Sequence, residues 1–284
     1  MKAPPFAYQR AASLAAACAL LDTHGGNARI LAGGQSLIAT LNLRLSQPDL
    51  LIDISRLAEL RGIRVTASEM VIGALTRHVD IERSAEVKRF FPTLVEAARH
   101  IAHPAIRNRG TIGGSIALAD PAAEWPAASL ACDMSFTAVS SKGERRLGSA
   151  DFFKGLYETS LTAGEVLKSI HVPLPAAGAR SAFGELTRRS GDYAIAGAFV
   201  NATLAGGKLA DVRAAFFGVA TQPILAKGAM QALEGTTGDA AAIAAARACL
   251  AADLDPIADL YNSPATKLHL SGVLLGRLVA KLIA

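Results

Sequence analysis

The 284-residue sequence has few cysteines and few aromatic residues, and each shortage excludes a class of protein. Its only cysteines, Cys18, Cys132 and Cys249, lie far apart and form no CxxC pair. Such scattered cysteines argue against a disulfide framework and favour a reducing compartment. A cysteine-ligated iron–sulfur cluster needs four thiolates, so this chain does not supply one alone. Aromatic residues make up 5% of the chain and do not interleave with a basic run, which disfavours nucleic-acid binding.

Several motifs that would identify an enzyme are also absent. The sequence has no GxGxxG fingerprint after an expected strand, no GxxxxGK[ST] loop and no GxSxG motif, which disfavours NAD binding, NTP binding and serine hydrolysis. His100 and His103 are three residues apart, but a two-histidine metal site requires further ligands. We therefore expect no catalytic residue and no metal site in this chain, as in a protein whose chemistry belongs to its cofactor.

The sequence has no long hydrophobic run. The start, Met1-Lys2-Ala3-Pro4-Pro5, has no apolar segment behind its charge, unlike a signal peptide. The Ala-rich stretch 240–252 contains Arg247 and is shorter than the ~20 apolar residues of a bilayer span. We expect a cytoplasmic protein without a membrane span. The formal net charge of +5 suits an anionic ligand or an acidic partner equally well.

What is present is an ordinary folding composition, with 51% hydrophobic and 19% charged residues. The first half alternates short apolar runs with helical patterns. Helices are predicted over 11–24, 37–45 and 90–101, with another after Pro126, and strands over 28–32, 50–54, 70–74 and 134–140. Ser36 is expected to cap the helix over 37–45. This alternation is typical of an α/β domain.

The second half has a different character. Pro173, Pro175 and Gly178 gather within 172–182, so we place a boundary there, between domains 1–176 and 177–284. The runs 194–204 and 208–219 are rich in strand-forming residues and are joined by a Gly206-Gly207 turn, which predicts a hairpin. Ala-rich helical stretches with breaks near 235, 255 and 263 come after the hairpin. The second domain is predicted to be a small antiparallel sheet backed by helices, giving an α+β chain overall.

Two glycine pairs stand between an extended segment and a helical one: Ala32-Gly33-Gly34-Gln35-Ser36 and Thr111-Ile112-Gly113-Gly114-Ser115. Glycine lets the backbone approach an anion closely, and successive N–H groups form an anion-binding nest. Arg29 and Arg44 lie near the first loop in sequence, and Arg107 and Arg109 near the second. Either pair alone also fits a plain tight turn, whereas two nests together suit two phosphates.

The order of these segments resembles the medium, FAD-binding subunits of molybdenum hydroxylases, the family of xanthine dehydrogenase and aerobic carbon monoxide dehydrogenase. The resemblance runs nearly end to end. It is carried by both glycine loops, by Ala119-Asp120-Pro121-Ala122-Ala123-Glu124-Trp125-Pro126, by Gly164-Glu165-Val166-Leu167 and by Arg188-Arg189-Ser190-Gly191-Asp192-Tyr193-Ala194. One departure concerns a lysine that some relatives carry just after a Ser-Ala-Phe-like segment, because Gly184 and Glu185 follow Phe183 here.

The resemblance implies a two-subdomain FAD-binding domain of the PCMH (vanillyl-alcohol oxidase-like) type, followed by a carbon monoxide dehydrogenase flavoprotein-like C-terminal domain. It also implies the FAD-contacting positions, which are Ala32, Gly33, Gly34, Gln35, Ser36, Ile101, Thr111, Ile112, Gly113, Gly114, Ser115, Glu124, Leu167 and Tyr193. Tyr193 would lie near the isoalloxazine. Without the resemblance, Tyr193 reads as a packed core tyrosine, and Asp120 with Glu124 as a solvated helix start.

By the same resemblance, the chain is an electron-transfer subunit. A large molybdopterin subunit and a small subunit with two [2Fe–2S] clusters would join it, as a dimer of heterotrimers, and FAD would pass electrons to an external acceptor. Two alternatives stay open. One is an assembly or sugar-phosphate-binding module that has lost electron transfer, and the other is an independent flavin oxidase.

Overall fold

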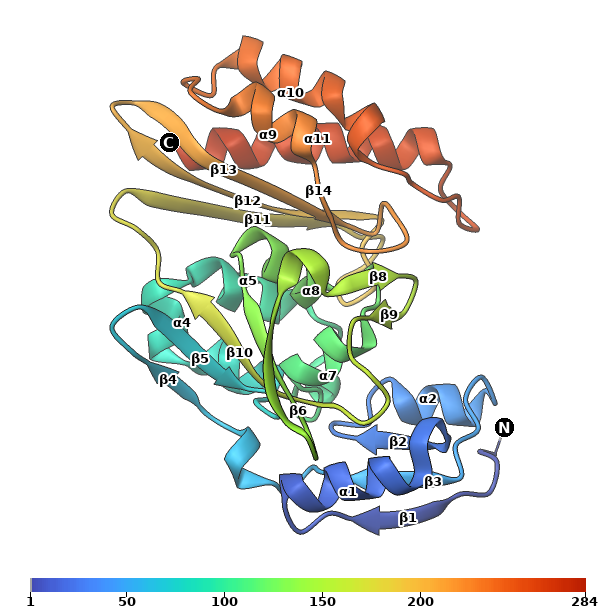
Figure 1. Cartoon of the computed structure of the whole chain (residues 1–284). Coiled ribbons are helices and arrows are strands. Elements are labelled where there is room, and N and C mark those ends of the chain that lie inside the picture. The colour runs from blue at the N-terminus through green and yellow to red at the C-terminus, as the bar shows by residue number, and fades with distance from the viewer. Residues whose placement is uncertain (1) are drawn as a thin grey trace.

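The computed structural model describes residues 2–284, which form three larger sheets and one two-stranded sheet, with their helices; the three larger sheets are stacked in chain order (Figure 1). The first unit contains β1 (Ala7–Arg10), α1 (Leu14–His24), β2 (Ala28–Leu31), α2 (Leu37–Asn42) and β3 (Leu50–Asp53). Its strands are parallel in the order β1-β3-β2. The buried side of α1, with Leu14, Cys18 and Leu21, packs on this sheet.

The middle unit is built on a five-stranded antiparallel sheet in the order β4-β5-β10-β6-β7. These strands are β4 (Ile63–Val65), β5 (Glu69–Gly73), β6 (Ser135–Ser140), β7 (Gly143–Gly148) and β10 (Val166–Pro173), and β8 (Phe153–Gly155) pairs with β9 (Glu158–Thr159) apart from them. The helices are α3 (His78–Arg83), α4 (Ala85–Phe90), α5 (Pro92–His100), α6 (Pro104–Arg107), α7 (Ile112–Leu118) and α8 (Glu124–Ala131). Parallel pairing is therefore confined to the first unit among the described residues.

The last unit is an antiparallel sheet, β11 (Ala179–Leu186), β12 (Ala196–Ala205), β13 (Lys208–Phe217) and β14 (Ile224–Leu225), in that order. Gly206 and Gly207 form the predicted β12–β13 turn, both with positive φ, as a type I′ hairpin requires. Helices α9 (Lys227–Leu233), α10 (Ala240–Asp253) and α11 (Pro264–Ile283) cover one face (Figure 1). Pro264 begins α11 behind the N-cap Ser263.

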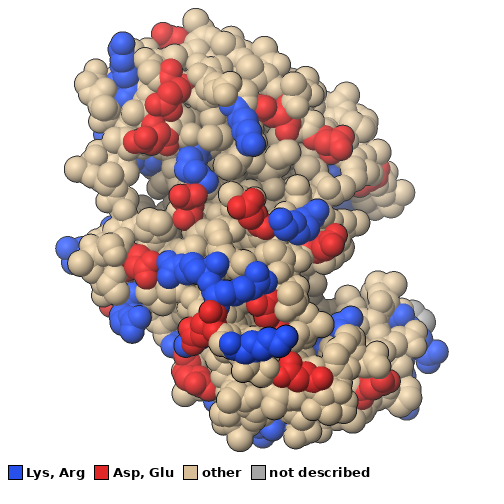
Figure 2. Space-filling view, in the orientation of Figure 1, with Lys and Arg blue, Asp and Glu red and all other residues tan. Residues whose placement is uncertain are grey.

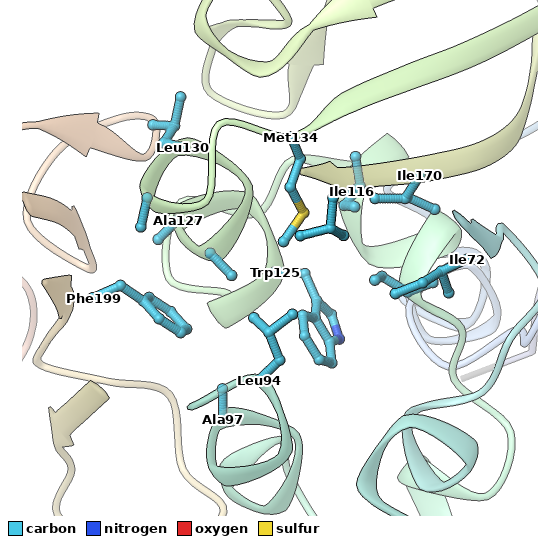
Figure 3. Packing of buried hydrophobic residues seen from close by; sticks show 14 of the residues in the cluster. Ile72, Leu94, Ala97, Ile116, Trp125, Ala127, Leu130, Met134, Ile170 and Phe199 are labelled. Carbon is cyan, nitrogen blue, oxygen red and sulfur yellow. The ribbon is translucent and has the colours of Figure 1, made fainter. Parts of the chain in front are cut away.

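One hydrophobic core joins the middle and last units. Phe199 and Phe217 of the last sheet belong to the same buried cluster as Leu94 of α5 and Trp125 of α8. Figure 3 shows Phe199 on one side of this cluster, with Leu94 and Trp125 facing it. The face of the sheet away from α9–α11 thus packs on α5 and α8, so neither unit buries this surface alone.

The predicted helices and strands of the first half are all present, and the hairpin is confirmed. One prediction needs correction: α8 begins at Glu124, two residues before Pro126, because proline is tolerated in the first turn of a helix. The strands that were not predicted are β1, β4, β7, β8, β9, β10, β11 and β14. The predicted boundary at residues 176/177 lies between β10 and β11 and stays a prediction. No helix within residues 2–284 is long and apolar enough to cross a membrane.

The shared core predicts that the middle and last units unfold together. Phe199→Ala removes a fully buried ring and should lower the free energy of unfolding by about 3–5 kcal/mol, within a single denaturant transition. Leu260→Ala, at a residue that is 85% exposed, is the control and should stay within about 0.5 kcal/mol. Two separate transitions in the wild-type chain would contradict the prediction.

Candidate cofactor site

A cavity of about 750 Å³ opens between the first unit and the rest of the chain. Both glycine loops line it, and the surface is visibly hollowed between these parts at the right of Figure 2. Its wall includes every residue predicted to contact FAD except Ile112. Ile112 is fully buried in the core cluster, so its side chain faces away from the cavity. A volume of this size is typical of a cofactor pocket.

The first loop offers free hydrogen-bond donors. Within residues 2–284, the backbone N–H groups of Gly33, Gly34, Gln35 and Ser36 donate to no protein acceptor. Ser36 occupies the N-cap position of α2, but its hydroxyl does not cap this helix, contrary to the expectation from the sequence. Four consecutive unpaired N–H groups and a free hydroxyl at a cavity wall match the oxygens of an anion such as a phosphate.

The second loop is different, because its N–H groups are already used. Ile112 and Gly113 donate to the carbonyls of Thr76 and Ala74, at 3.0 and 2.9 Å. Gly114 donates to the Thr111 hydroxyl at 3.1 Å, which caps α7. The prediction that this loop forms a second anion nest is therefore wrong, because these N–H groups are not free. The second loop forms a rigid wall, and Gly114 and Ser115 still face the cavity from it.

The glycines are required chiefly for packing between loops. A Cβ on Gly33 would lie 2.3 Å from the carbonyl oxygen of Arg109, and one on Gly113 would lie 2.5 Å from the Cβ of Ala74. Gly34 has φ +75°, a conformation that favours glycine. Gly33 of the first loop thus touches the backbone of Arg109 and Gly110, just before the second loop, and this contact sets the spacing between the two loops.

Of the four arginines considered as charge partners, only Arg29 reaches the cavity wall. Arg107 binds Glu82 at 3.1 Å and the carbonyls of Ile101 and Ala102, so it holds the segment that presents Ile101. Arg109 lines a separate groove of about 710 Å³ behind the first loop. The exposed Arg44 contacts the carbonyl of Lys2.

Acidic groups gather at the other end of the cavity. Asp120 and Glu124 line the wall, and Glu185, whose side chain is 3% exposed, binds His100 Nδ1 at 3.0 Å. Burial, together with the charges of Glu185 and Asp120, raises the pKa of Glu124 to about 8. The Glu185 carboxylate accepts a hydrogen bond from His100 Nδ1–H and so raises the pKa of His100. Asp120 is buried, so the reading of Asp120 and Glu124 as a solvated helix start is wrong.

Two tyrosines stand at the rim. Tyr193 is 69% exposed, which rules out the core-tyrosine reading, and it lines the cavity beside Gly191. Tyr157, in the β8–β9 turn, has a left-handed backbone with φ 57°. Its hydroxyl lies 3.4 Å from Asp120. Strained backbone of this kind concentrates at ligand sites.

Sequence reasoning missed Tyr157 and His78, and both line the cavity. No local pattern marks either residue: His78 becomes part of the wall only because the fold brings Gly110 against its ring. Within residues 2–284, no group of three His, Cys, Asp or Glu residues could hold a metal ion. His100 instead pairs with Glu185, and the His103 ring lies against Gly191.

Family models match both halves of the chain. Residues 4–175 match the FAD binding domain in molybdopterin dehydrogenase, and residues 181–282 match the CO dehydrogenase flavoprotein C-terminal domain. The chain is 40% identical over 282 residues to the 6-hydroxypseudooxynicotine dehydrogenase complex subunit alpha of Paenarthrobacter nicotinovorans, covering 99% of this chain and 95% of that one.

Solved structures agree. Carbon monoxide dehydrogenase from Hydrogenophaga pseudoflava, in a form lacking the Mo-pyranopterin moiety of its molybdenum cofactor, superposes with a TM-score of 0.97 at 40% identity, over 99% of this chain and 98% of that one. Quinoline 2-oxidoreductase from Pseudomonas putida 86 gives 0.94 at 35% identity, over 100% and 98%. The fold and the site therefore define an FAD-binding oxidoreductase component. The chain belongs to the family of FAD-binding medium subunits of molybdenum hydroxylases.

The contact between the loops predicts a strong effect of one methyl group. Gly33→Ala should lower the free energy of unfolding by about 1–3 kcal/mol or more, because the backbone of Arg109 leaves no room for a Cβ at position 33. It should also lower the FAD content of the purified protein. Gly26→Ala is the matched control, since a Cβ there meets nothing within 4 Å. Equal melting temperatures and equal FAD content for the two variants would contradict this account.

The raised pKa of Glu124 predicts a pH-dependent stability. The folded chain keeps this proton up to about pH 8, whereas the unfolded chain releases it near pH 4.3, so stability falls as pH rises between these values. Glu124→Gln mimics the neutral form. Compared with wild type, its free energy of unfolding should be equal near pH 4 and a few kcal/mol higher at pH 8, at about 1.4 kcal/mol per pKa unit. Urea titrations at both pH values measure this difference.

A second carboxyl provides the control with the opposite sign. The hydrogen bond from Arg145, at 2.8 Å, lowers the pKa of Glu165, so its ionised form stabilises the fold. Glu165→Gln should therefore lose stability at neutral pH, and this loss should shrink as the pH falls below about 4. A gain for Glu165→Gln, or a Glu124→Gln effect that does not change with pH, would contradict the assignment.

Proposed function

We propose that this chain is the electron-transfer subunit of a heterotrimeric molybdenum hydroxylase. In this complex a small subunit with [2Fe–2S] clusters delivers electrons to FAD held in the cavity between the two glycine loops. The observation that carries the proposal is the first glycine loop, whose four N–H groups have no acceptor within residues 2–284 and lie on the wall of a 750 Å³ cavity. Bound FAD supplies the uptake and release of electrons, one or two at a time.

The chain's own residues hold and shield the cofactor. We assign Gly33, Gly34, Gln35 and Ser36 to the diphosphate, through their unpaired donors. The second loop, with Thr111 and Ser115, would fix the opposite side. Ile101 and Leu167 would make apolar contacts, and Glu124 and Tyr193 would lie at the isoalloxazine end, where the acidic groups gather. No acid–base residue is required for electron transfer itself.

The proposal also includes the partner subunits and the substrate of the whole complex. The names of relatives include a dehydrogenase complex subunit and medium chains or subunits, which supports large and small partners. A dimer of heterotrimers, an external acceptor and a cytoplasmic location remain part of the proposal, as does the boundary at 176/177. Carbon monoxide, purines, N-heteroaromatic compounds and aldehydes are all candidate substrates, since the large subunit would select among them.

The test is co-expression with the two partner subunits, followed by anaerobic addition of candidate substrates with an artificial electron acceptor. We expect bound FAD in the complex and loss of its visible absorbance when substrate is added. A complex without the small subunit is the control and should leave the flavin oxidised. A complex that reduces its iron–sulfur clusters but never its flavin would favour the alternative of an assembly module.

A further inference from the structure

His78 is held rigidly at the wall of the cavity. It is the first residue of α3, and its backbone N–H donates to the carbonyl of Gly110 at 3.0 Å. Its side chain is buried but lines the cavity. A Cβ on Gly110 would lie 2.7 Å from His78 Nε2, so the glycine just before the second loop leaves room for this edge of the ring.

Trp125 decides which nitrogen of His78 carries the proton. The indole Nε1–H lies 2.9 Å from His78 Nδ1. An indole N–H donates and never accepts, so Nδ1 must be the unprotonated nitrogen of the ring. The neutral imidazole therefore carries its proton on Nε2.

The surroundings keep this arrangement fixed. Trp125 is 1% exposed and packs in the central core, where Figure 3 shows its ring beside Leu94. Burial, and then the charge of Arg107, lowers the pKa of His78 to about 4. The ring is thus neutral at neutral pH, and rotation of the indole away from it would open the core.

The Nε2–H group has no acceptor of its own. Across the described chain, residues 2–284, the only side-chain hydrogen bond of His78 is the one from Trp125. His78 Nε2 is not fully buried, so it reaches open space, and the space that His78 lines is the cofactor cavity. A donor with a defined tautomer is therefore presented to whatever fills that cavity.

We propose that His78 donates its Nε2–H to an acceptor atom of bound FAD, and that Trp125 is the positioning residue that fixes this tautomer. The inference rests on the proposed function, because FAD must occupy the cavity. The acceptor is a diphosphate oxygen or a carbonyl oxygen or nitrogen of the isoalloxazine ring. All of these atoms accept a hydrogen bond from a neutral N–H. Spectra of the bound cofactor distinguish an acceptor on the diphosphate from one on the isoalloxazine ring.

The tautomer is tested directly by nitrogen NMR of the full chain with labelled histidine, before and after FAD is added to the cofactor-free protein. The chain has 6 histidines, and His78→Asn identifies the signals of His78 by their loss. We expect a protonated Nε2 and an unprotonated Nδ1 at pH 7. The Nε2 signal should shift when FAD binds. In Trp125→Phe, a signal from protonated Nδ1 should appear.

Binding is tested with a matched pair of variants. His78→Asn keeps an acceptor for the Trp125 indole at the δ position but removes the ε donor, whereas His78→Gln places an amide donor near the ε position. For His78→Asn we expect FAD affinity to fall roughly 10-fold to 100-fold if the acceptor is a diphosphate oxygen, and by less than roughly 10-fold if it lies on the flavin ring. His78→Gln should recover part of the loss.

Two spectra identify the acceptor. A phosphorus shift that differs between wild type and His78→Asn assigns the diphosphate, and an altered visible flavin spectrum assigns the ring. Trp125→Phe should weaken binding in wild type but add nothing in the His78→Asn background, because it acts only through the Nε2–H of His78, which His78→Asn removes.

The outcomes separate this inference from the proposed function. If the wild-type chain binds no FAD, the proposed function fails. If wild type binds FAD, but His78→Asn binds it equally well and the Nε2 signal does not move, only the role of His78 is overturned. Melting curves of the FAD-free variants show whether a lost affinity reflects lost folding. Weaker binding by an equally stable His78→Asn protein supports the proposal.

Discussion

The close contact between the first glycine loop and the backbone of Arg109 is the constraint on which the site depends. Gly33 has no side chain, and this lets a turn of the parallel sheet touch the segment that leads into α7. The contact ties the first unit to the middle unit beside the cavity. Since interiors are close-packed, one added methyl group changes the spacing between the loops. The shape of the cavity therefore follows from a contact between protein segments.

The two glycine loops have similar sequences but different structural roles. The N–H groups of Ile112, Gly113 and Gly114 donate to protein acceptors, so the second loop lines the cavity without offering these donors to a ligand. Among the described residues, no protein acceptor pairs with the N–H groups of Gly33 to Ser36 in the first loop. Water can reach these partly exposed N–H groups, and a bound diphosphate would replace that water with charged acceptors. Binding would thus stabilise the very contact between units that creates the site.

Local patterns predicted what is locally determined. Apolar runs such as Leu50-Leu51-Ile52 and the Gly206-Gly207 turn carry their own signal, and so do the two glycine loops. Strand β7, with the exposed sequence Gly-Glu-Arg-Arg-Leu-Gly, has no apolar alternation and forms because β6 offers it an edge. His78 was missed for a related reason: its role depends on Trp125, 47 residues away, and no sequence window contains both.

The same distinction applies to charge. Four arginines lie near the glycine loops in sequence, but of these only Arg29 lines the cavity, and Arg107 holds the segment of Ile101 instead. The donors that the first loop offers are backbone N–H groups, which have no protein acceptor within the described residues. At the far end, Glu124 keeps its proton at neutral pH because burial and two neighbouring carboxylates oppose its ionisation. Asp120, Glu165 and Asp192 also line this cavity, so a protonated Glu124 removes one negative charge that would otherwise oppose an anionic ligand. Polarity here comes from backbone and protonation state, which composition does not reveal.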